Sequence, residues 1–218
     1  KNNVKIQPNA DSTTNTTIYD KDGNLLFLID STNDYVKVGS GQQFANTQYA
    51  YFGIGHVSTA AFVANTHYAI PFSVSYLAAA TADVDFGTGT DPDDSFTTAD
   101  TDTQYASQIV RCFWRVPDAI SIDSITHIEG ADAATGDTTR MHLKSFDFTS
   151  GSTSCLTNGT LLAHNTDITN AGNEQAYLST WTVDSASVTA GKVILCFFRS
   201  DSVNSDYTLN VTIKYHLI

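Results

Sequence analysis

The sequence predicts an all-β protein, in which a short β stalk of residues 1–45 precedes a jelly-roll-like antiparallel β-sandwich of residues 46–218. Three observations lead to this prediction. Apolar and polar residues alternate along many segments, with the period of a half-buried strand. Turn-forming residues separate these segments at the spacing expected for a sandwich or jelly roll. Strands do not alternate with helical patterns, and no long amphipathic helix is present, which argues against a parallel α/β sheet.

Three short apolar runs lie near the N-terminus. Residues 16–19, 25–29 and 35–38 are rich in β-branched and aromatic side chains, which favour strands. The residues at 22–24 read Asp-Gly-Asn, a strong hairpin turn, and polar residues at 31–34 separate the second run from the third. We therefore predict a three-stranded meander.

Both faces of the middle run are apolar. Leu25, Phe27 and Ile29 share one face, and Leu26 and Leu28 share the other. So small a meander cannot bury both faces by itself, so other chains must cover it. Threefold association around a shared axis would do so. The predicted trimer-interface residues are Leu25, Leu26, Phe27, Leu28, Ile29, Val36 and Val38.

These runs belong to a longer motif. Residues 20–30 read Asp-Lys-Asp-Gly-Asn-Leu-Leu-Phe-Leu-Ile-Asp, and residues 36–39 read Val-Lys-Val-Gly. The combination resembles a motif of bacteriophage tail-fibre and virion-appendage proteins, roughly D-x-D-G-N-x-L-F-x-V-D followed by V-x-I-G, and residues 206–218 have a looser likeness to the same family. The resemblance implies a homotrimeric stalk on the virion surface, with other virion proteins of the capsid or tail as partners.

The remaining segments predict the strands of the head. The most regular is 206–217, where every second residue from Leu209 to Leu217 is apolar. Residues 193–198 are apolar on both faces, so we expect the sandwich core to cover one face and a neighbouring subunit the other. Residues 46–67 have no clear period and are interpreted as a connector. The other predicted strands are residues 68–76, 108–116, 120–128, 140–148, 160–163, 175–183 and 192–198.

Composition excludes several classes of function. Lys and Arg number 11 against 23 Asp and Glu, a net charge of -12, which would repel nucleic acid. No apolar run approaches the roughly 20 residues that cross a bilayer, so membrane insertion is not expected. Because the chain begins at Lys1 and its only methionine is Met141, we expect a processed or excised form.

The sequence contains none of the common catalytic motifs. The six histidines lack H-E-x-x-H spacing, and no G-x-S-x-G elbow is present. We therefore predict no catalytic residues, no cofactor and no enzymatic activity, although two aspartates could still form a glycosidase pair in space. The acidic loop 83–102 could hold a cation or be a plain solvated insertion, and we favour the solvated insertion, with no metal site, because the loop lacks the calcium-loop pattern.

Three cysteines are too few for a disulfide framework. Cys112 and Cys196 lie in apolar segments and are expected to be buried thiols, and Trp114 and Trp181 are expected to pack in the core. Taken together, the sequence predicts a structural protein of the phage particle surface, either a capsid decoration protein or head fibre, or part of a tail fibre. The alternative is a module of a tail fibre that binds a host surface glycan, and a depolymerase is the third possibility.

Overall fold

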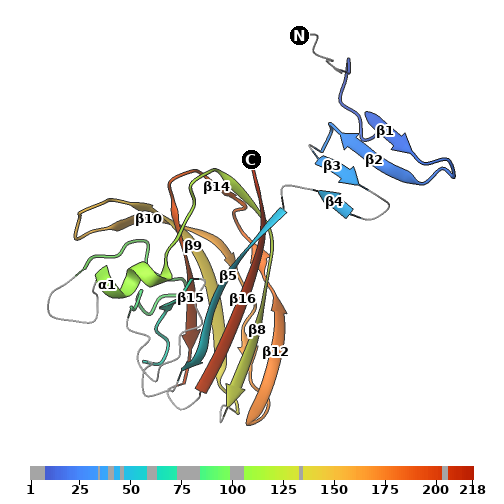
Figure 1. Ribbon diagram of the computed structural model, residues 1–218. Helices are drawn as coiled ribbons and strands as arrows, with labels where there is room; N and C mark the ends of the chain where they lie inside the picture. Colours follow the sequence, from blue (N-terminus) through green and yellow to red (C-terminus); the bar gives the residue numbers. More distant parts are fainter. Residues whose placement is uncertain are drawn as a thin grey trace. The chain divides into compact units, whose positions relative to one another are not determined.

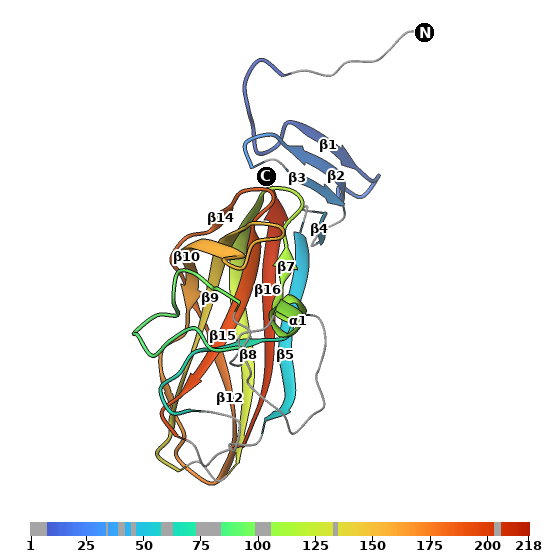
Figure 2. The same cartoon turned by 90° about the vertical axis from the view of Figure 1, so that its left-hand side faces the viewer.

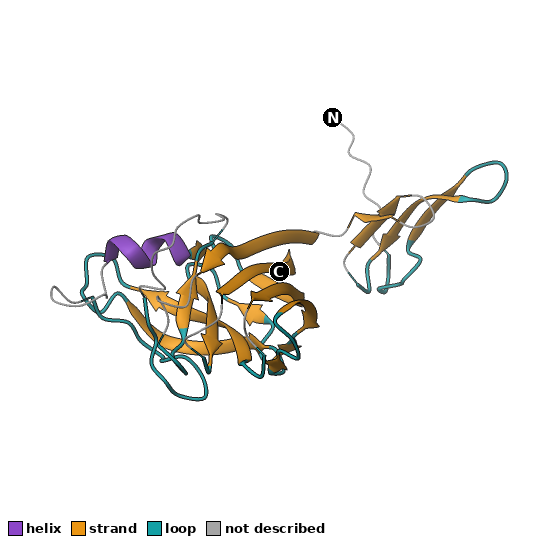
Figure 3. Cartoon of the chain, turned by 90° about the horizontal axis from the view of Figure 1, so that it is seen from below, coloured by secondary structure: helices purple, strands orange, loops and turns teal. Residues whose placement is uncertain are grey.

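The structure is a computed structural model, which describes residues 8–33, 35–38, 42–44, 47–57, 63–72, 84–98, 106–132, 135–202 and 206–218. The chain is nearly all-β, as predicted, with one short α-helix in these residues (Figure 3). It forms two compact units, residues 1–47 and 48–218. We call the strands of the first unit the meander and the second unit the head.

The meander is a four-stranded antiparallel sheet in which each strand pairs with the next along the chain (Figure 1). Three of its strands coincide with the predicted runs, and the fourth was not predicted. Their bounds are β1 (Thr16–Tyr19), β2 (Leu25–Asp30), β3 (Tyr35–Val38) and β4 (Gln42–Phe44).

The head is an antiparallel β-sandwich of two sheets (Figure 1). Its eight principal strands are β5 (Thr47–Val57), β6 (Tyr68–Ile70), β8 (Ile120–Asp132), β9 (Thr138–Phe148), β10 (Leu156–His164), β12 (Glu174–Thr180), β15 (Val193–Ser200) and β16 (Asp206–Leu217). One sheet has the order β12-β8-β16-β5 and the other contains β10-β9-β15-β6. This interleaving of early and late strands is the strand order of a jelly roll. The short strands β7 (Trp114–Arg115), β11 (Ile168–Thr169), β13 (Thr182–Val183) and β14 (Ser187–Val188) extend the two sheets.

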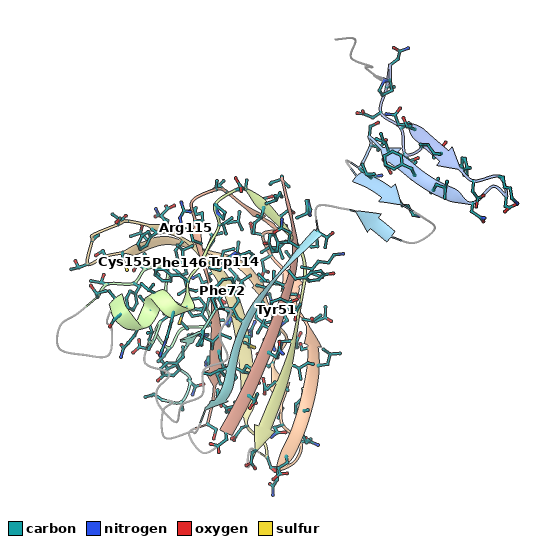
Figure 4. All side chains as sticks on the ribbon, viewed as in Figure 1. Tyr51, Phe72, Trp114, Arg115, Phe146 and Cys155 are labelled. Atoms are coloured by element: carbon teal, nitrogen blue, oxygen red, sulfur yellow. The ribbon has the colours of Figure 1, made fainter. Side chains whose placement is uncertain are left out.

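The main core lies between the two sheets. Alternate residues of β16 point into it, as the period of this strand predicted, and Val211 and Ile213 are fully buried. Phe72 and Trp114, labelled in Figure 4, stack with ring centroids 5.9 Å apart. Trp181 also belongs to this core, in agreement with the sequence analysis.

A second apolar core covers the outer face of the β9/β15 sheet, on the side where α1 (Ala106–Ile109) lies (Figures 1 and 2). The covering segment 84–98 contributes Phe86, whose ring lies 4.7 Å from that of Phe197 on β15. Our expectation that a neighbouring subunit covers this face of β15 is therefore wrong. The same chain covers it with the loop that we had interpreted as a solvated insertion.

Two predicted elements were also wrong. Residues 108–113 are not a strand, because α1 is followed by the 3₁₀ helix η2 (Val110–Cys112), and the strand β7 contains only Trp114–Arg115. The segment interpreted as a connector contains β5, an 11-residue strand. Its inward residues Phe52 and Ile54 are buried, but the glycines between and after them hid the alternation.

The cysteines behave as apolar side chains. Cys112, Cys155 and Cys196 are all free and buried. Burial raises the pKa of the Cys112 thiol to about 12 and that of the Cys196 thiol well above its ordinary value. Because the thiolate is the nucleophilic form, these two thiols are unreactive at neutral pH. In the described part of the chain, no helix is long and apolar enough to cross a membrane.

Candidate functional site

Turn hydrogen bonds, rather than a core, define the shape of the meander. The carboxylate of Asp20 accepts bonds from the backbone N–H groups of Asp22 and Asn24, both at 2.8 Å, and from the Asn24 side chain. These bonds, chiefly the one from the Asn24 side chain, lower the pKa of Asp20. Asp30 accepts three similar bonds from Thr32 and Asn33 after β2. Each aspartate thus fixes the turn that follows it.

One face of the meander is apolar and stays partly exposed among the described residues. Ile18 on β1 pairs with Phe27 on β2, and Ile29 on β2 pairs with Val36 on β3, so these four side chains share a face across three strands. Ile18 is 52% exposed, and Phe27, Ile29 and Val36 are only partly buried. The predicted interface residue Leu25 is also partly buried on this face. We call these five residues the apolar face of the meander.

The opposite face differs from expectation. Leu28 is buried in the single chain, at 7% exposure, whereas Leu26 beside it is 48% exposed. Val38 ends β3, and its side chain lies outside the described residues. Among the described side chains of this unit, Leu28 is the one apolar residue that is buried. The meander therefore lacks a core of its own, as so small a sheet should.

In the head, the acidic loop meets a row of basic side chains on the outer face of β9. The ammonium of Lys144 is almost completely buried and donates hydrogen bonds to the carbonyl of Pro92 and the carboxylate of Asp94. Asp91 lies 3.3 Å from the ring of His142, two residues earlier on the strand. Asp94, one of the loop carboxylates that we had considered as cation ligands, is therefore directed at a cation of the same chain.

Two buried histidines continue this cluster. The rings of His67 and His142 are 4.9 Å apart, and the Nε2–H of His67 donates to the carbonyl of Gly89 at 3.1 Å. Burial lowers the pKa of His67 to about 4 and that of His142 to about 2. The nearby groups His67, Arg140, His164 and Lys144 further disfavour a positive charge on His142 and so also lower its pKa. Both imidazoles are therefore neutral at pH 7.

The cluster is suited to holding the loop in place and not to chemistry on a substrate. His67 and His142 have no exposed surface, so neither can reach a ligand in solution. Among the described residues, no group of three or more His, Cys, Asp or Glu side chains could hold a metal ion. Sequence reasoning missed this cluster because His67, Asp94 and Lys144 are far apart along the chain. The alternation of His142 and Lys144 with apolar residues on β9 was the only available signal.

Comparison with known proteins adds no identity. The sequence matches no known protein family and no curated protein. The resemblance to phage appendage proteins therefore depends on residues 20–39 and, more loosely, on residues 206–218. The apolar face of the meander lies mostly within the first of these two segments, because Ile18 is the one residue of the face that precedes residue 20.

Proposed function

We propose that this chain is a structural protein of the bacteriophage particle surface, which acts by protein–protein association through its meander. One observation carries the proposal. Ile18, Phe27, Ile29 and Val36 form an apolar face in register across three strands, and none of them is buried. At about 25 cal/mol per Å² of apolar surface, leaving such a face in water forfeits stabilisation that association would recover.

The occupant of this face is further copies of the same chain, as a homotrimer. Three meanders around a common axis can bury the same face of each one in a shared core, which a single four-stranded sheet cannot provide. The resemblance of residues 20–39 to a phage stalk motif also implies three chains. The jelly-roll head is compatible, since this fold recurs in viral capsid proteins, but that likeness is an analogy of fold alone. A capsid decoration protein, a head fibre and a tail-fibre segment all fit this proposal.

The test is a mass measurement on matched variants. Native mass spectrometry of the full chain should give three times 23.5 kDa. Phe27→Asp should shift the population to monomers, because three carboxylates would meet in an apolar core. Leu178→Asp is the control, since Leu178 is 75% exposed on the head and undergoes the same change.

Two outcomes would overturn the proposal. A wild-type chain that stays monomeric at micromolar concentration would show that the apolar face needs no second copy. A trimer that survives Phe27→Asp but dissociates with Leu178→Asp would place the assembly surface on the head instead.

A further inference from the structure

Two arginines lie side by side on the outer face of the head. Arg140 on β9 and Arg199 on β15 are direct cross-strand partners in the β9/β15 ladder. The chain has only four arginines, so half of them meet here. Like charges directly opposite on a sheet destabilise each other, which makes the pairing costly unless an anion offsets it.

The two guanidinium groups are neutralised unequally. Arg140 donates to the carboxylate of Asp167 at 3.2 Å and so has a counter-ion. Arg199 donates to the side-chain amide oxygen of Asn65 at 2.8 Å, which carries no charge. Within the described ranges Arg199 forms no ion pair, although the chain has a net charge of -12. The Nε–H of Arg140 is also buried without a partner.

Both arginines line a pocket of about 240 Å³. Drug-sized ligands occupy roughly 300–1,000 Å³, so this pocket suits a smaller ligand such as a single sugar ring. Its wall combines donors with acceptors, because Thr138, Asp167 and Asp201 also line it. Asn65 also lines the pocket and adopts a left-handed backbone with φ of 61°, a conformation that asparagine tolerates better than most residues.

We propose that this pocket binds an acidic sugar, a pyranose that carries one carboxylate, such as a hexuronate. The carboxylate would pair with Arg199, whose planar fork of N–H donors matches it. The sugar hydroxyls would donate to Asp167 and Asp201 and bond to the hydroxyl of Thr138. A sulfate or phosphate fits less well, because its oxygens need donors throughout and the two aspartates would repel it.

This inference concerns the head alone, and it does not depend on how the chain assembles. It also names the chemistry by which the head would recognise a glycan. A single sugar in an open polar pocket is expected to bind with a dissociation constant on the order of 1 mM. NMR titration of the full chain can measure such weak binding.

The experiment compares two ligands and four proteins, the wild type and three variants. Methyl glucuronide and methyl glucoside differ only in the carboxylate, and we expect the glucuronide to bind about 10- to 100-fold more tightly, the effect of one charge-assisted contact. Arg199→Gln should weaken glucuronide binding by a similar factor. Arg115→Gln is the matched control, because Arg115 is an exposed arginine on β7 of the same unit (Figure 4).

Each contrary result would overturn the proposal. These results are no saturable binding of the glucuronide, equal binding of the two sugars, or glucuronide affinity that Arg199→Gln leaves unchanged. Arg199→Lys guards against a folding artefact, since it keeps the charge and loses the planar fork. We expect this variant to fall between the wild type and Arg199→Gln, and binding equal to the wild type would contradict recognition by the fork.

Discussion

Phe197 on β15 and Phe27 on β2 have similar sequence contexts, because each lies in a strand with apolar side chains on both faces. Their environments are nevertheless opposite. Phe197 is fully buried, since the segment 84–98 of the same chain covers the outer face of β15. Phe27 is only partly buried. A two-faced apolar strand therefore needs two covers. The described residues of this chain supply both covers in the head, whereas in the meander they leave Phe27 partly exposed.

The two units also use aspartate differently. In the meander, Asp20 and Asp30 accept hydrogen bonds from the turns next to them. In the head, Asp91 and Asp94 reach His142 and Lys144, which are about 50 residues away in sequence. The meander is thus built from local interactions and the head from distant ones. Local turns fix the shape of a sheet, but they do not bury its faces.

The largest expected effect is on the free energy of unfolding of the head, and it should differ between substitutions of the two phenylalanines. Phe197→Ala should lower the free energy of unfolding of the head by about 3–5 kcal/mol, because it leaves a cavity in a fully packed core. Phe27→Ala should leave the head's unfolding midpoint nearly unchanged and should weaken assembly. Urea unfolding followed by tryptophan fluorescence distinguishes the two, since both tryptophans, Trp114 and Trp181, lie in the head. Similar losses of head stability in both variants would contradict the comparison.

Much of the fold could be predicted from the sequence. Strands with regular alternation, such as β16 and the first three strands of the meander, coincide with the predicted runs. Local turn chemistry and side-chain period fix such elements. β5 was missed because Gly53 and Gly55 occupy its outward positions. Residues 108–113 were predicted as a strand from their apolar pattern, but Ile109 and Cys112 pack against the outer face of a sheet from helical turns instead.

The candidate sites were harder to predict than the strands. The apolar face of the meander follows from two short hairpins that join consecutive strands, so most of its residues could be named in advance. Arg140 and Arg199 become neighbours only through the register of β9 with β15, and Asn65 joins them from a loop. Alternation shows which face a side chain occupies, but not which strand lies beside it. The pocket could therefore not be found without the structure.

A pH titration tests the polar cluster that holds the segment 84–98 on the outer face of the β9/β15 sheet. The pKa of His67 is lowered to about 4 by burial, whereas an unfolded histidine titrates near 6.5. Below about pH 6.5 the unfolded chain binds the proton and the folded chain does not, so stability is lost as the pH falls toward 4. For His67 the loss should be on the order of 2 kcal/mol at pH 5.

The groups that face His67 and its neighbour His142 are Asp91, Arg140, Lys144, His164 and Arg199. The test variant is His67→Gln, which can still donate to the carbonyl of Gly89 and cannot titrate. Its urea midpoint should match the wild type at pH 7, which controls for damage to the fold, and should fall less steeply toward pH 5. Equal slopes in the two proteins would show that His67 is not protonated on unfolding.

The smallest expected effect is the backbone strain caused by replacing one glycine in each unit with alanine. Gly23 and Gly191 both have left-handed backbones, with φ of 81° and 87°, and an added Cβ would meet nothing within 4 Å at either position. Alanine should therefore cost about 1 kcal/mol of backbone strain at each site and cause no clash. Gly191→Ala should lower the free energy of unfolding of the head by that amount, and its urea midpoint should fall accordingly. Gly23→Ala should leave that midpoint unchanged and should instead raise the concentration at which the chain dissociates, because the strain lies in the hairpin that presents Ile18 and Phe27. If both variants shift the fluorescence midpoint equally, the meander and the head unfold as one unit, and the contrast between them fails.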